Sequence, residues 1–133
     1  MHDLIQSALE TAVEAALPGV PMKRENIKFK PVEGEEWARV THILANTEAA
    51  ALGSATVEYN GYTQVDILVP ADTGPGRAGV LAQQVESALP TGASMTVGSD
   101  RLHVRSCSRG TSLEEPVWYT VPVRIHWRLQ HLT

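Results

Sequence analysis

Cysteine and long apolar runs are nearly missing from this chain of 133 residues. Cys107 is the only cysteine, which excludes an internal disulfide, and we expect it to pack as a small apolar side chain in or near a strand rather than act as a nucleophile. No apolar run approaches the about 18 residues that a membrane span needs. The N-terminus also lacks the basic and then apolar order of a signal peptide. These absences indicate a protein of a reducing compartment with no membrane-spanning segment.

Positive charge is scarce as well, because 11 Lys and Arg stand against 15 Asp and Glu and leave a formal net charge of −4. The cations are scattered, and the one local group comprises Lys23, Arg24, Lys28 and Lys30. Tight nucleic-acid binding normally needs a basic stripe that replaces counterions on phosphates. A helix that lies on a membrane surface needs a basic face too. The sequence therefore predicts neither specific nucleic-acid binding nor membrane attachment.

The clearest pattern in the chain is its last segment, since every odd position from 117 to 129 is apolar. Side chains alternate across a strand, so this pattern predicts a long strand with one buried face. Sheets that are wet on one face are usually antiparallel. Pro122 has no N–H to donate to a ladder, which favours a sheet edge or a bulge. A free edge invites a partner, so the strand indicates assembly more than chemistry.

Trp118 lies on the polar face of that strand, where an aromatic side chain is costly to leave in water. One interpretation is that a loop or a strand end of the same chain covers it. The other is that it contacts another subunit, because aromatic residues are enriched in interface cores.

Two amphipathic helices are expected, at residues 3–17 and 76–89. Asp3 is a suitable N-cap for the first, and its Glu10 and Glu14 are expected to face away from the apolar stripe. Between the helices, the Ala-rich segment 46–54 is able to hold a helical turn. Further strands are expected at 37–45, 55–59, 62–69, 94–97 and 101–107.

Asn60-Gly61 separates two of these strands. Such a pair is either a two-residue hairpin or a bulge inside one longer strand, and we favour the bulge. In the strand that follows, Val65, Ile67 and Val69 are expected to face the core, with Asp66 on the opposite face.

The order of helix, strands, helix and strands predicts an α+β fold in a single domain that spans residues 1–133. We expect a mostly antiparallel or mixed sheet with the two helices packed on one face. The second helix is expected to make one crossover.

The segment Gly74–Gly79 matches the pattern G-x-G-x-x-G between a strand and a helix, which is the context of a dinucleotide site. Three residues separate the strand from Gly74, and Pro75 removes an N–H from the loop that would hold phosphate. No second βαβ half follows. We therefore interpret the segment as a flexible glycine loop.

Other candidate chemistry is equally sparse, and we expect no catalytic, cofactor-binding or metal-binding residues. His103 and His126 lie on wet faces of two strands, yet a metal site would also need a carboxylate such as Asp66. Glu114 and Glu115 lie in a polar segment, where we expect them to be solvated, whereas general acid catalysis needs a buried carboxyl group.

Several ordered segments resemble the tail terminator-like proteins of long-tailed bacteriophages, which are minor tail proteins. The strongest are Gly61-Tyr62-Thr63-Gln64-Val65-Asp66-Ile67-Leu68-Val69-Pro70 and the strand from Trp118 to Trp127. The others are the helix from Leu4 to Leu17, Asn26 to Pro31, Trp37-Ala38-Arg39, Leu52-Gly53, and Gly74 with Gly76 ahead of Leu81-Ala82.

The resemblance implies a structural subunit without catalytic residues or cofactors. It implies a ring, typically a hexamer, which sits on the last ring of the tail tube, stops tube growth and offers a surface for head attachment. The implied partners are copies of the chain itself, the tail tube protein and a head-completion protein, and the isolated protein can still be a monomer. The implied location is the virion tail, and the bacterial host cytoplasm during assembly. Candidate contact residues are Arg39, Asp72, Arg77, Trp118, Arg124 and Arg128.

Three alternatives stay open at this point. The first is another head–tail connector, or a prophage-derived subunit, with the same fold. The second is a small anion-binding or ligand-binding module that uses the Gly74–Gly79 loop. The third is a metal hydrolase.

Overall fold

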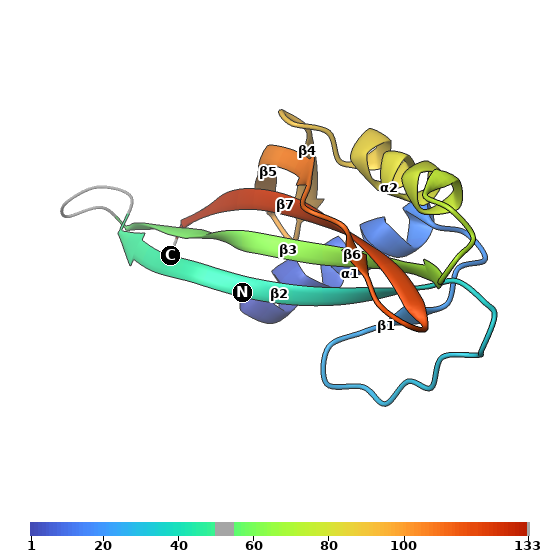
Figure 1. Ribbon diagram of the computed structural model, residues 1–133. Helices are drawn as coiled ribbons and strands as arrows, with labels where there is room; N and C mark the ends of the chain where they lie inside the picture. The colour runs from blue at the N-terminus through green and yellow to red at the C-terminus, as the bar shows by residue number, and fades with distance from the viewer. Residues whose placement is uncertain (50–54, 133) are drawn as a thin grey trace.

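The structure is a computed structural model that describes residues 1–49 and 55–132. Within that range, one seven-stranded sheet packs against two helices, which confirms the predicted α+β class (Figure 1). Neither helix is long and apolar enough to cross a membrane. The elements are α1 (His2–Ala16), β1 (Met22–Lys23), β2 (Trp37–Ala49), β3 (Thr56–Pro70), α2 (Gly76–Ala88), β4 (Ser94–Val97), β5 (Asp100–Arg109), β6 (Leu113–Glu114) and β7 (Trp118–Leu132).

The sheet is mixed, with the strand order β1-β2-β3-β7-β5-β4 and with β6 paired to β7 beyond the end of β5. Only the β1–β2 pair is parallel among the described strands, and all other pairs are antiparallel. Helix α2 carries the chain from β3, in the middle of the sheet, to β4 at its far edge. This crossover agrees with the sequence prediction.

The core lies between one face of the sheet and both helices. The odd positions of β7 from Val121 to Leu129 are buried there, as are Val65, Ile67 and Val69 of β3, which were predicted to face inward. Tyr119 is only partly buried, and Val117, also predicted to face the core, precedes the strand and is exposed. Because these strands alternate between a dry and a wet face, the other face stays available for polar side chains. The helices contribute Ile5, Leu9, Val13, Leu17, Ala78, Leu81, Ala82, Val85 and Leu89.

Strand β7 is a central strand, so the prediction that Pro122 marks a sheet edge is wrong. The carbonyl oxygen of Pro122 accepts a 2.9 Å hydrogen bond from the backbone N–H of Gly110. Within a strand the N and O of one residue point to the same side, so the Pro122 nitrogen faces Gly110 as well. Gly110 lies in the gap between the end of β5 and the start of β6. The missing N–H therefore falls where no ladder needs it.

The bulge expected at Asn60-Gly61 is found in the partner strand. Strand β3 runs unbroken through both residues, which excludes the hairpin, and Ala45 of β2 is the extra residue between the Leu44–Gly61 and Asn46–Asn60 pairs. A Cβ atom on Gly61 would lie 2.3 Å from the backbone oxygen of Ile43. Only glycine allows the bulged strand to approach this closely.

Two local expectations differ from the structure, and one strand was not expected. Helix α1 starts at His2 without a side-chain cap, so Asp3 lies in its first turn instead of capping it. The helical turn expected within 46–54 is absent up to Ala49, because β2 continues to that residue, and residues 50–54 lie outside the described range. The short strand β1 had no clear signal in the sequence.

Candidate functional site

The sheet face opposite the helices gathers cations that are far apart in the sequence. On β7, Arg124, His126 and Arg128 are exposed, while the residues between them lie in the core. Strand β5 pairs with β7 and adds its own exposed residues beside them. We call this surface the basic face, and it comprises Arg101, His103, Arg105, Arg124, His126 and Arg128. The scattered spacing of these residues along the chain did not indicate such a patch.

The arginines of the basic face have weak partners within the chain. The Nε of Arg124 donates to the amide oxygen of Gln64 at 3.0 Å, and its guanidinium lies 5.5 Å from the ring centre of Tyr62. Arg128 lies 4.0 Å from a carboxylate oxygen of Glu58, the longest ion pair in the described part of the chain. Exposed pairs of this kind contribute little to stability. The positive charge therefore remains available to a partner.

Arg39, on the same side of the sheet, is neutralised. Its Nε lies 3.1 Å from a carboxylate oxygen of Asp66, and the amide of Gln64 donates to the other oxygen at 2.9 Å. Asp66 is on the outer face as predicted, yet it is only 5% exposed.

Two shallow clefts hollow the basic face. One, of about 460 Å³, is lined by Tyr62, Arg105 and His126 among others. Arg105 is the extra residue of a bulge in β5, where the register with β7 shifts between Val104 and Ser106. The second cleft, of about 330 Å³, is lined by Arg101, His103 and Arg128 together with Asp100. Both clefts present cationic or imidazole groups, which suit carboxylate side chains.

An acidic cleft lies beside the glycine loop, at the other end of β7. It has a volume of about 390 Å³ and is lined by Ala71, Asp72, Gly74, Pro75, Glu114, Glu115 and Tyr119. Its three carboxylates would repel a phosphate group. The geometry therefore disfavours the anion-binding alternative for the Gly74–Gly79 loop.

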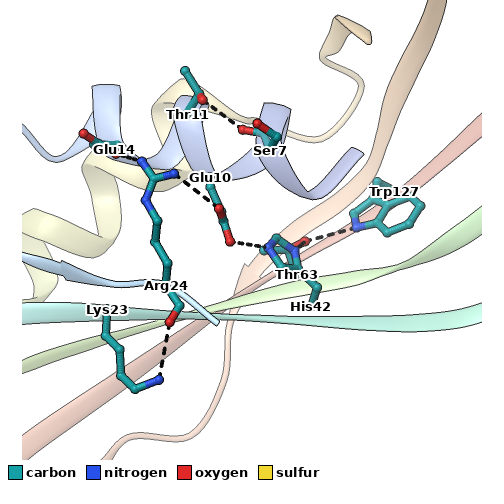
Figure 2. Close-up of polar contacts among 9 residues, drawn as sticks. All are labelled: Ser7, Glu10, Thr11, Glu14, Lys23, Arg24, His42, Thr63 and Trp127. Carbon is teal, nitrogen blue, oxygen red and sulfur yellow. Dashed lines mark hydrogen bonds and ion pairs between the residues drawn. The ribbon is translucent and has the colours of Figure 1, made fainter. Parts of the chain in front are cut away.

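A buried chain of polar contacts joins both layers of the fold (Figure 2). The indole N–H of Trp127 donates to the hydroxyl oxygen of Thr63 at 3.2 Å, and that hydroxyl lies 3.0 Å from Nδ1 of His42. The other ring nitrogen of His42 lies 3.1 Å from Oε1 of Glu10, and Arg24 donates to the other carboxylate oxygen, Oε2, at 3.4 Å. Glu10 was predicted to face solvent, but the His42 contact turns it against the sheet.

This order of hydroxyl, imidazole and carboxylate resembles a catalytic triad, which no local pattern of residues indicated. The location argues for a structural role. Thr63 is 0% exposed, and the His42 side chain is only 2% exposed. The small adjoining cavity of about 130 Å³ is lined by His42 and Trp127 but not by Thr63. A substrate would not reach the hydroxyl, so the contacts serve to hold α1 on the sheet.

Cys107 on β5 is half-buried and packs against the core, as predicted for a small apolar side chain. Burial raises the pKa of its thiol from 9.0 to about 11, and the nearby carboxylate of Glu86 acts in the same direction. The thiolate is the nucleophilic form of cysteine, so this site suppresses reactivity.

We predict that Cys107 reacts with a disulfide reagent about a hundredfold more slowly at pH 8 in the folded protein than in urea, because the raised pKa lowers the thiolate fraction. The folded state holds this proton more tightly. Its contribution to stability is therefore complete below pH 9 and is lost as the pH rises toward 11. Equal rates in the folded and unfolded protein would contradict the assignment.

Arg77, at the start of α2, forms a two-pronged ion pair with Glu36, at 2.8 and 2.6 Å. The hydrogen bonds from Arg77 lower the pKa of Glu36 below 4.5. We predict that Arg77→Ala returns this pKa to its ordinary value in an NMR titration. In the wild-type protein the pair contributes above pH 4.5, and its contribution is lost as the pH falls through the lowered pKa. The effect on stability will be small because both groups are exposed to solvent.

Trp118 belongs to an aromatic cluster on the outer face, at the end away from the basic face. Its ring meets Trp37 edge-on at 5.9 Å, and Phe29 stacks on Trp37 at 5.2 Å. Trp37 is 7% exposed, whereas Trp118 stays partly exposed. Trp118 is thus covered in part by Trp37 of β2, across the intervening strand β3 of its own chain.

His103 and His126 do lie on neighbouring strands, as expected. In the described part of the chain, however, no group of three or more His, Cys, Asp or Glu residues is placed to hold a metal ion. Asp66, the carboxylate considered for such a site, is bonded to Arg39 and Gln64 instead.

A family model of the phage tail terminator protein matches residues 3–127. The chain belongs to this family. The match covers both helices and nearly all of the sheet, so it includes the acidic cleft and every residue of the basic face except Arg128. No relative was found among curated proteins.

Solved structures share the fold of this tail terminator. One protein chain with 26% sequence identity superimposes with a TM-score of 0.79, over 100% of this chain and 98% of its own. A chain from the virion of a native gene transfer agent particle has 14% identity and a TM-score of 0.67, over 95% of this chain and 94% of its own. The family places this protein among the structural proteins of phage tails.

The six contact residues expected from the sequence occupy different parts of the tail terminator. Arg124 and Arg128 lie on the basic face, and Asp72 lines the acidic cleft. The other three already have partners within the chain: Arg39 pairs with Asp66, Arg77 with Glu36, and Trp118 packs on Trp37. Arg101, Arg105, Glu114 and Glu115 were not predicted as contact residues, because their proximity depends on strand order.

Proposed function

We propose that copies of this chain form a ring, typically a hexamer, that caps the tail tube. The ring stops tube growth and offers its free surface to a head-completion protein. The family match over residues 3–127 carries this proposal. Assembly takes place in the bacterial host cytoplasm, and the protein ends in the virion tail.

The charge distribution supports a role in assembly. A ring subunit needs contact surfaces for its neighbours and for the tube, and closed rings use two different patches on each subunit. The basic face and the acidic cleft are two such patches. We propose that Arg124, Arg128 and Asp72 lie in these contacts. Arg39, Arg77 and Trp118 are weaker candidates because they are already engaged within the chain.

We propose no catalytic role for the protein. The triad-like contacts of Thr63 are buried, and the Cys107 thiol is held protonated. Neither group is placed to attack a substrate, so the protein acts through the shape and charge of its surface.

Deleting the gene from the phage or prophage that encodes the chain tests the proposed function. Electron microscopy should show tail tubes of unregulated length without attached heads, and supplying the wild-type protein should restore uniform tails. Tails of normal length that still join heads in the deletion strain would overturn the proposal.

A further inference from the structure

Charge is strongly segregated over this chain. Among the described residues, the basic face holds four arginines with two neighbouring carboxylates, Glu58 and Asp100. The chain has 11 Lys and Arg and 15 Asp and Glu in total. Removing the four arginines, Glu58 and Asp100 leaves seven Lys and Arg against thirteen Asp and Glu, so the rest of the chain is acidic by nearly two to one. A net charge of −4 conceals this division.

The acidic cleft is a concave surface in the acidic part of the chain outside the basic face. Asp72, Glu114 and Glu115 are all exposed, and no cation lines the cleft. Strand β7 passes both surfaces, since Tyr119 lines the cleft and Arg128 stands on the basic face. Along β7, Tyr119 lies five residues from Arg124 and nine from Arg128, which corresponds to about 17 and about 30 Å. The two charged surfaces therefore lie far apart on one subunit.

We infer that neighbouring copies join head to tail, with the basic face of one copy against the acidic cleft of the next. This inference rests on the proposed ring function and names the surfaces that close the ring. A two-fold pairing of either surface with itself would place like charges together, which is costly. Pairing of unlike surfaces repeats around a ring until it closes. A nucleic acid is a poorer occupant of the basic face, because the acidic remainder repels phosphate.

Two charge-reversed variants test this pairing. Arg124→Glu with Arg128→Glu makes both surfaces acidic, and Glu114→Lys with Glu115→Lys makes both basic. Each variant alone should associate at least about tenfold more weakly than the wild-type protein at low ionic strength, as measured by sedimentation. An equimolar mixture should assemble again, since an alternating ring restores every contact.

Two matched control variants carry the same double charge reversals at positions outside both surfaces. Lys28→Glu with Lys30→Glu, and Glu33→Lys with Glu35→Lys, alter exposed residues of the segment between β1 and β2 and should leave association unchanged. Circular dichroism checks that every variant folds.

Three results would overturn the inference. The first is a mixture that stays dissociated although both variants fold. The second is a wild-type protein that remains monomeric at millimolar concentration in low salt. The third is tight binding of duplex DNA, measured by fluorescence anisotropy, that only the arginine variant loses. This result would mean that the basic face binds phosphate groups instead of the acidic cleft. The gene deletion tests the proposed function separately from these three results. If the deletion strain loses control of tube length but the two surfaces do not pair, the proposed function stands and only the pairing is wrong.

Discussion

Replacing Gly61 with alanine is expected to destabilise the protein by about 3 kcal/mol and to lower its melting temperature by roughly 10 °C. The added Cβ would meet the backbone oxygen of Ile43 at 2.3 Å and two further backbone atoms of β2 at 3.1 Å. Backbone atoms inside a sheet cannot swing aside as a flexible side chain can. The bulge around Ala45 would have to open or the strands would have to separate.

Urea unfolding followed by circular dichroism measures this effect. Gly76→Ala is the matched control, because a Cβ there meets nothing within 4 Å and Gly76 opens helix α2. The control should lie within about 0.5 kcal/mol of the wild type. A Gly61→Ala protein that is as stable as the control would show that the bulge does not constrain this position.

The second large effect is expected from Thr63→Val. Valine has nearly the shape of threonine but no hydroxyl, so the indole N–H of Trp127 and Nδ1 of His42 would both lose their partner inside the core. Each buried polar group left unpaired costs about 1–3 kcal/mol, and we expect a total loss of about 3 kcal/mol.

Thr63→Ser separates the contribution of the hydroxyl from that of the methyl group, because serine keeps the hydroxyl and its hydrogen bonds but lacks the methyl group. It should lose only about 1 kcal/mol. Hydrogen exchange at the Trp127 indole, observed by NMR, should be faster in the valine variant and nearly unchanged in the serine variant. Valine and serine variants of equal stability would contradict the assigned role of the hydroxyl.

The sequence was most informative where burial alternates residue by residue. The odd positions of β7 from Val121 to Leu129 and the residues Val65, Ile67 and Val69 of β3 each face the core because one side of the sheet is covered by helices. The helices were recognised by the same principle with a period of 3.6. A hydrophobic pattern of this kind indicates which face of a helix or strand is buried, but it does not show which elements pack against that face.

The order of the strands in the sheet could not be predicted from the sequence. Pro122 correctly indicated a missing ladder bond, but the gap between β5 and β6 that accommodates it forms only in the folded sheet. The basic face depends in the same way on β5 lying beside β7. The contact of Glu10 with His42 joins residues 32 positions apart, and no local signal marks it.

The most direct test of the central claim is cryo-electron microscopy of intact tails. The account predicts one closed ring of this fold at the head-proximal end of each tube, with the basic face of every copy against the acidic cleft of its neighbour. Finding the fold repeated along the tube, located at the distal tip, or missing from the particle would contradict it.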